Sequence, residues 1–145
     1  MKLLTSTDYA LRVLIRLATT PESHISTETL AQELLVSPHH LRKIVQFLTE
    51  AGFVRTIRGT HGGVMLARPA SQINLAAVVR QHEKDQALVE CFRSDRGACN
   101  LLPRCRLRGI LKAAKESFYG HLDRYTLEDC FIGSHTTSKR RPIRI

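Results

Sequence analysis

The chain has 145 residues, enough for one domain of ordinary size with a continuous core. Its 22 Lys and Arg residues against 13 Asp and Glu residues give a formal net charge of +9, and most of the excess falls within residues 1–80 and 134–145. That distribution is typical of a nucleic-acid-binding head beside a nearly neutral segment. No stretch has the length and apolar character of a signal sequence or membrane span, so we expect a cytosolic protein whose thiols stay reduced.

A first helix is predicted from about residue 5 to residue 19. Asp8 lies in its first turn, where the helix dipole favours a carboxylate, and Arg12 follows one turn later, within reach of an ion pair. The apolar face is predicted to consist of residues at helical spacing, namely Leu11, Leu14, Ile15 and Ala18.

Two further helices carry clear start signals. Ser26 and Ser37 are both typical N-caps, and Pro38 suits a first helical position. Only a few residues around Leu35 separate the two helices, which predicts a helix-turn-helix. Donors on the outer face of the second helix, which starts at Ser37, could reach base edges or phosphates, although a solvated face would look the same. They are His39, His40, Arg42, Lys43 and Gln46, opposite an inner stripe of Leu41, Ile44, Val45 and Leu48.

Residues 53–66 then alternate between apolar and polar, apart from a break that reads Arg58-Gly59-Thr60-His61-Gly62-Gly63. This pattern predicts a two-stranded ribbon with a glycine-rich basic tip. A helix-turn-helix followed by a basic hairpin is a winged helix, so we expect double-stranded DNA as partner. Arg58 is placed to enter a minor groove, with Gly59 and His61 beside it. The fold class predicted is mainly α with a small β-wing.

A fourth helix, with Asn74 as N-cap, ends the predicted DNA-binding domain at residue 84. The next predicted segment, residues 85–132, begins with a polar loop that holds Cys91, Cys99 and Cys105. Such a loop cannot bury itself, so a metal, an iron–sulfur cluster or disulfides must hold it. A reducing compartment argues against disulfides.

A long helix is predicted to start near Pro103, with Cys105 in its first turn. Because a winged-helix head has its own core, we expect the apolar stripe of this helix to pack on a second subunit rather than fold back. The stripe comprises Leu107, Ile110, Leu111, Ala114, Phe118 and Leu122. Residues 133–145 are predicted to be a disordered basic tail.

Three features together resemble the NsrR-type repressors over nearly the whole chain, up to Phe131: the opening Leu-Thr-Ser-Thr-Asp-Tyr-Ala-Leu-Arg, the Arg-Gly-x-x-Gly-Gly wing, and three cysteines before a long helix. These are nitric-oxide-sensing members of a winged-helix iron–sulfur regulator family that also includes IscR. The resemblance implies a homodimer that binds a cluster through Cys91, Cys99 and Cys105. It also implies repression of nitric oxide detoxification genes at inverted-repeat operators, with release of DNA when nitric oxide attacks the cluster.

For the fourth ligand the resemblance points to Asp8 of the other subunit, since Arg108 stands where IscR-like members have a histidine. A hard carboxylate would leave one iron open to an incoming ligand. Two alternatives remain from the residues themselves: Asp8 serves only the helix start beside Arg12, or Cys130 is the ligand, although its apolar neighbours favour a half-buried structural cysteine. Glu83 is a candidate to join Asp8 and Arg12 in a charged network.

A [4Fe-4S] cluster is favoured over [2Fe-2S]. Three alternative functions use the same residues: an IscR-like regulator of other genes, a zinc-stabilised DNA-binding protein that adds Asp8 or Cys130 to the three thiols, and a peroxide sensor based on Cys105. An enzyme is not expected, because the sequence has no phosphate-binding glycine loop and no catalytic constellation that the predicted helices would assemble.

Overall fold

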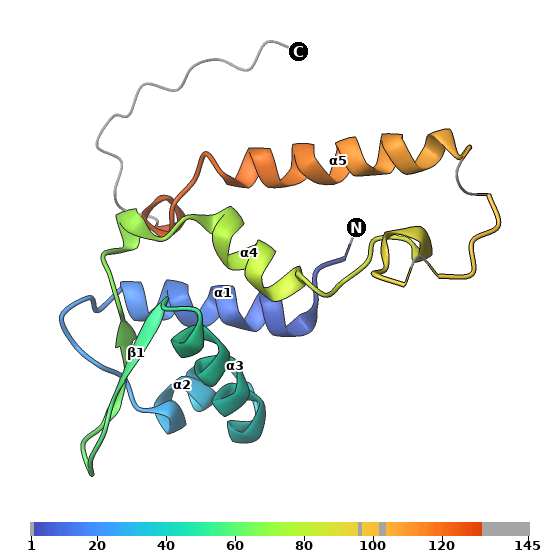
Figure 1. Ribbon diagram of the computed structural model, residues 1–145. Helices are drawn as coiled ribbons and strands as arrows, with labels where there is room; N and C mark the ends of the chain where they lie inside the picture. The colour runs from blue at the N-terminus through green and yellow to red at the C-terminus, as the bar shows by residue number, and fades with distance from the viewer. Residues whose placement is uncertain (1, 96, 102–103, 132–145) are drawn as a thin grey trace.

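The computed structural model describes residues 2–95, 97–101 and 104–131, so the predicted basic tail lies outside the described residues. The helices and strands confirm a mainly α fold with a small β-wing (Figure 1). In chain order they are α1 (Thr5–Ala18), α2 (Thr27–Glu33), α3 (Pro38–Glu50), β1 (Val54–Ile57), β2 (Gly63–Leu66), α4 (Leu75–Glu83) and α5 (Arg106–Leu122), with 3-10 turns η1 (Ala70–Gln72), η2 (Glu90–Phe92) and η3 (Leu127–Cys130).

The helix-turn-helix forms as its capping signals predict. The Ser26 hydroxyl accepts a hydrogen bond from Thr29 N at 3.0 Å, and the Ser37 hydroxyl accepts one from His40 N at 3.3 Å. Between the two helices Leu35 adopts a left-handed conformation, with φ of 53°, and its side chain is 90% exposed. The tight turn therefore depends on a backbone conformation that leucine rarely adopts.

The wing is an antiparallel pair in which Val54 lies opposite Leu66 and Ile57 opposite Gly63. Its tip requires glycine, since Gly59 has φ of +115°. A hydrogen bond of 2.6 Å joins His24 Nε2 to the His61 carbonyl oxygen, so the loop before α2 supports the tip. The base of the wing belongs to the core, because Val54 and Val64 are fully buried.

The core is centred on α1, which contacts α3, β2, α4 and η3. The apolar face predicted for this helix was too narrow: Leu11 and Ile15 are only half-buried, whereas Ala10, Val13 and Leu17 are buried with Leu14 and Ala18. Elements pack around α1 on several sides, so its buried surface is wider than a single stripe. Fully buried partners come from every neighbouring element, including Leu30, Leu41, Leu48, Ile73 and Val78.

The end of the described chain returns to this core. Leu127 of η3 is fully buried, and its N–H donates to the Ile73 carbonyl oxygen at 2.8 Å. The bridge between Asn74 and Thr126 continues that pairing. Leu127, which the sequence analysis assigned to the second segment, is therefore part of the core formed by the winged helix.

Helix α5 crosses over α4, and its N-terminal half extends beyond the head towards the cysteine loop (Figure 1). Tyr119, near its C-terminal end, is buried against the head, whereas Leu107 and Ile110 are 57% and 64% exposed. Within the described part of the chain, no helix has the length and apolar character needed to cross a membrane.

Candidate nucleic-acid interface and cysteine site

The outer face of α3 is open to solvent along its length. All five side chains predicted to face DNA are exposed, and the inner stripe of α3 is buried as predicted. The Ser37 hydroxyl oxygen caps the helix, and Gln46 Nε2 donates to Glu50 Oε1 at 2.9 Å. The exposed residues are His39, His40, Arg42, Lys43 and Gln46.

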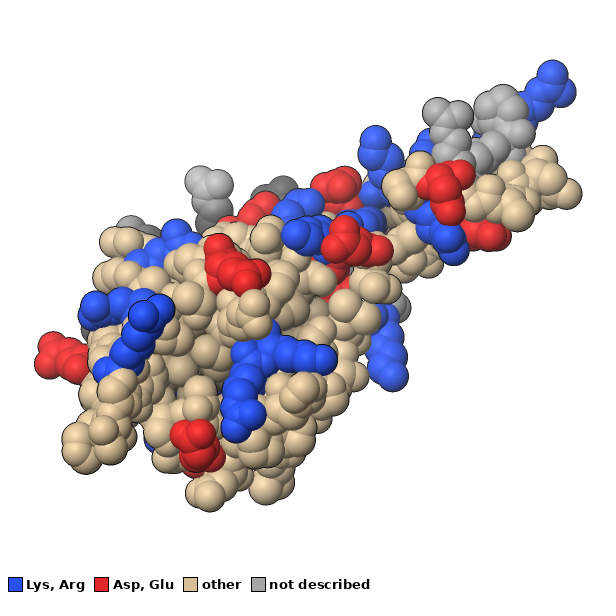
Figure 2. Space-filling view, turned by 60° about the horizontal axis from the view of Figure 1, so that its bottom comes forward, with Lys and Arg blue, Asp and Glu red and all other residues tan. Residues whose placement is uncertain are grey.

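The wing tip lies at the α2–α3 end of the head, far from the cysteine loop (Figure 1). Arg58, Gly59 and His61 are all exposed there. Figure 2 brings this side forward: basic side chains lie on either flank of the head with acidic ones scattered between them. An exposed helix beside a basic, glycine-rich hairpin can insert the helix into a major groove and the hairpin into an adjacent groove.

The three clustered cysteines carry free thiols on one loop. Cys91 lies in η2 and is buried, and Cys99 and Cys105 are half-buried. Cys105 was predicted to lie in the first turn of this helix, and the prediction was wrong by one residue: Cys105 is the N-cap of α5, and the first helical residue is Arg106. The soft thiols fit an iron–sulfur cluster or a zinc ion as a donor set. Among the described residues, however, no three His, Cys, Asp or Glu side chains stand close enough to hold a metal ion.

Asp8 pairs with Arg12 in this chain, as helical spacing suggests. Asp8 Oδ2 lies 2.7 Å from Arg12 Nη2, and the two side chains are about half exposed. Glu83 takes no part in that pair, so the predicted charged network is wrong. Its carboxylate instead caps α1: Oε1 accepts from Leu4 N at 2.8 Å and from the Thr7 hydroxyl at 2.5 Å.

The capping role of Glu83 has a simple cause. Leu4 occupies the N-cap position of α1 and has no side-chain acceptor. Glu83 ends α4 beside that helix start and is only 8% exposed, so its carboxylate accepts from the N–H of Leu4 itself and from the Thr7 hydroxyl. A leucine before the Thr-Ser-Thr run was the available sequence signal, but it does not say which residue provides the acceptor.

Cys130 lies at the other end of α5 from Cys105. Seventeen helical residues separate the two ends, about 25 Å at 1.5 Å per residue. Cys130 is half-buried, and burial, followed by the Asp129 carboxylate, raises the pKa of its thiol. Within one chain it therefore stands apart from the other three thiols (Figure 1).

A hollow of about 590 Å³ lies behind the outer face of α3, between that helix, the start of α1 and the end of α4. His82, which the sequence did not single out, lies against Phe47 in its wall. The lining residues are Thr5, Ser6, Tyr9, His40, Lys43, Ile44, Phe47 and His82.

Known proteins are similar to this chain in sequence and in architecture. The family model described as "Rrf2: Iron-dependent Transcriptional regulator" matches residues 3–131. A Geobacillus kaustophilus protein named HTH-type transcriptional regulator NsrR is 45% identical over 89% of this chain and 88% of its own. A Bacillus licheniformis protein of the same name is 41% identical over 91% and 93%.

A solved structure extends the likeness to three dimensions. The structure of CymR, titled the global cysteine regulator of B. subtilis, has a TM-score of 0.63 and 31% identity, covering 89% of this chain and 95% of that one. The family consists of transcriptional regulators and not of enzymes. The chain described here belongs to the Rrf2 family of transcriptional regulators.

Proposed function

We propose that this chain forms a homodimeric repressor that binds inverted-repeat operator DNA and senses nitric oxide through an iron–sulfur cluster, controlling nitric oxide detoxification genes. The observation that carries the proposal is the set of three free thiols on residues 91–105 in a chain of this family. Support comes from the description of the family as iron-dependent and from relatives named NsrR.

The surface that contacts operator DNA would consist of the outer face of α3 and the wing. The outer donors of α3, together with Ser37 at its start, would contact bases and phosphates of a major groove, and Arg58, Gly59 and His61 would follow the adjacent minor groove. In a two-fold dimer, two such heads bind half-sites about 34 Å apart, which is one turn of DNA.

The dimer contact would be the exposed stripe of α5. Leu107 and Ile110 are more than half exposed, and Leu111 beside them is half-buried. A helix that leaves large apolar side chains in water gains about 25 cal/mol for each Å² covered by a partner. The same stripe on a second copy provides a self-complementary surface.

Cys91, Cys99 and Cys105 would hold the cluster, with Asp8 of the partner subunit as fourth ligand. When bound, the cluster supplies irons with which nitric oxide reacts. The Asp8 carboxylate would have two alternative partners, the cluster and Arg12. In the structure Asp8 is half exposed and pairs with Arg12. An exposed ion pair of this kind is worth less than about 1 kcal/mol, so it would yield readily to a metal bond.

The test begins with protein purified without oxygen and assayed for iron, acid-labile sulfide and visible absorption. Operator binding is then followed by fluorescence anisotropy while nitric oxide is added. We expect a coloured protein whose spectrum and operator affinity change together. Cys99→Ala should lose iron and operator affinity, whereas Cys130→Ala, the matched control, should keep both.

Other outcomes would favour the alternatives. A colourless protein that contains zinc and no sulfide would identify a zinc-stabilised regulator. Metal-free protein that loses operator affinity on peroxide treatment would identify a thiol sensor at Cys105. Unchanged operator binding after complete reaction with nitric oxide would contradict the proposal directly.

A further inference from the structure

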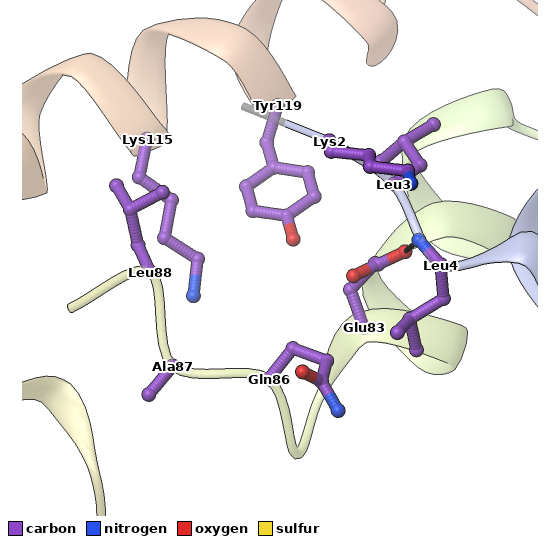
Figure 3. A pocket seen from close by; sticks show the side chains of 9 residues that line it. All are labelled: Lys2, Leu3, Leu4, Glu83, Gln86, Ala87, Leu88, Lys115 and Tyr119. Carbon is purple, nitrogen blue, oxygen red and sulfur yellow. Dashed lines mark hydrogen bonds between the residues drawn. The ribbon is translucent and has the colours of Figure 1, made fainter. Parts of the chain in front are cut away.

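A second cavity, of about 320 Å³, lies beside Glu83 (Figure 3). It is bounded by the start of α1, the end of α4, the first residues of the segment that leads to the cysteine loop, and α5. The lining residues are Lys2, Leu3, Leu4, Glu83, Gln86, Ala87, Leu88, Lys115 and Tyr119.

Two residues in this wall have little exposed surface, and each has a polar atom that faces the cavity without a hydrogen-bond partner among the described residues. Glu83 is 8% exposed and uses only Oε1 in capping α1, so Oε2 has no hydrogen bond within the described residues. Tyr119 is 5% exposed, and its hydroxyl likewise has no hydrogen bond to any described residue. Figure 3 shows both groups directed into the cavity. Neither atom is sealed from the cavity, so each can form a hydrogen bond to a molecule that enters it.

A third group adds the opposite charge. Lys115 lies one turn before Tyr119 on α5, with its Nζ 5.9 Å from the centre of the Tyr119 ring, and its ammonium also points into the cavity (Figure 3). It forms no ion pair with Glu83, which stands across the cavity on α4. Burial, followed by the Glu83 carboxylate, raises the pKa of Tyr119, so its hydroxyl remains a donor at neutral pH.

The cavity thus presents a free carboxylate oxygen on one wall and an ammonium with a hydroxyl on the other. Leu3, Leu4 and Leu88 provide aliphatic surface between them. The complement of this arrangement is a small molecule with a positive and a negative group and an apolar side chain. A volume near 320 Å³ stands at the lower end of the range for ligand sites, which suits a small metabolite.

We propose that this cavity binds a small aliphatic α-amino acid, with its ammonium on Glu83 Oε2 and its carboxylate between Lys115 and Tyr119. The bound molecule would join α4 to α5 beside the segment that leads to Cys91. Any difference in its affinity between the free and DNA-bound protein would appear equally as a change in operator affinity. The site goes beyond the proposed function, because it requires neither the cluster nor DNA.

The test is isothermal titration calorimetry of the full chain with L-valine, L-leucine and L-methionine. We expect at least one to bind at one site per chain with a Kd of about 1 mM or tighter. Two analogues of leucine separate the contributions of the ligand's ammonium and carboxylate to binding: 4-methylpentanoate lacks the amine, and 3-methylbutylamine lacks the carboxylate. Each should bind at least tenfold more weakly than the parent, because each lacks the group that pairs with one of the two charged side chains of the cavity.

Variants place the binding in this cavity. Lys115→Met and Tyr119→Phe should each weaken binding about tenfold or more, whereas Lys112→Met, an exposed lysine one turn earlier on α5, should have no effect. Glu83→Gln should act in the same direction, with circular dichroism to confirm that α1 still forms. The proposal is overturned if none of the three amino acids binds, if both analogues bind as well as leucine, or if Lys115→Met and Tyr119→Phe bind normally. None of these outcomes affects the repressor proposal, which rests on iron and operator binding.

Discussion

His82 at the end of α4 packs against Phe47 of α3, with ring centroids 3.9 Å apart and ring planes inclined by 57°. The contact joins the helix that leads towards the cysteine loop to the helix whose outer face is exposed for DNA. The Nδ1 atom of His82 is buried without a hydrogen-bond partner. A proton on this ring would therefore place a charge in a poorly solvated position behind α3.

The first prediction concerns pH. Burial lowers the pKa of His82 below its ordinary value of 6.5, and the neighbouring Glu83 carboxylate opposes part of that shift. As the pH falls, the unfolded chain binds this proton before the folded chain does, so the folded state loses stability. We expect the contribution of His82 to be complete above pH 6.5 and to decrease as the pH falls from there towards the folded-state pKa.

Urea unfolding of the reduced, metal-free protein between about pH 5 and pH 8 measures this effect, since histidine titrates in that range. His82→Phe should reduce the dependence of the unfolding free energy on pH. His121→Phe, which changes an exposed histidine on α5, should leave it as in the parent chain. An unchanged slope in His82→Phe would assign the pH dependence to other groups.

The second prediction concerns the turn of the helix-turn-helix. Leu35→Gly should stabilise the protein by up to about 1 kcal/mol. A left-handed leucine costs roughly 1–2 kcal/mol, and the greater conformational entropy of glycine in the unfolded chain offsets part of the strain that the substitution relieves. The side chain is 90% exposed, so little burial is lost. Leu35→Ala keeps the Cβ atom and should give no gain. Thermal and urea unfolding of the two variants decide the matter, and equal stabilities would show that strain is absent.

The third prediction concerns the return of the chain to the head. Leu127→Ala should destabilise the protein by about 2–5 kcal/mol, the range for a fully buried leucine. The matched control is Leu101→Ala, because that side chain is 66% exposed. The free energy of unfolding of both variants is measured by urea unfolding, with the helix content followed by circular dichroism. A small effect at Leu127 would mean that residues 123–131 fold apart from the head.

The fourth prediction concerns subunit association. Ile110→Asp places a charge in the exposed stripe of α5 and should convert a dimer into a folded monomer, because the side chain contributes little to the core of its own chain. Light scattering after size-exclusion chromatography gives the mass, and circular dichroism reports the fold. Lys112→Asp on the same helix should remain a dimer. A dimeric Ile110→Asp would place the subunit contact elsewhere.

The fifth prediction concerns the wing. Arg58→Ala should weaken operator binding and lower the slope of log affinity against log salt by about one, because the variant brings one positive charge fewer to the DNA and so releases fewer counterions. Arg124→Ala removes the same charge from the turn after α5 and serves as control. Anisotropy titrations at several salt concentrations provide both quantities. Equal slopes for the two variants would exclude Arg58 from the interface.

Much of the head could be predicted because its signals are local. The caps at Ser26, Ser37 and Asn74 each involve residues three positions apart, and all three form as predicted. The glycine-rich wing tip is equally local. Such features depend on the backbone of a few neighbouring residues, which a single sequence contains in full.

The sequence was less informative where distant segments meet. Nothing near Leu127 indicates that it packs beside Ile73, and nothing near Glu83 indicates that it caps α1. Periodicity marked one stripe of α1, but the buried surface depends on how many elements surround the helix. The grouping of Cys91, Cys99 and Cys105 remains a prediction, since their donor chemistry is local but their assembly around a metal is not.

The cap on α1 has a consequence for how the protein is made. The acceptor for the Leu4 N–H lies 79 residues further along the chain. Synthesis proceeds from the N-terminus, so the first helix leaves the ribosome well before α4 has been translated. Its opening turn therefore stays without an anchor while the helix-turn-helix and the wing can already form. The opening turn of α1 therefore gains its anchor only after α4 has been made, later than the wing that follows it in the sequence.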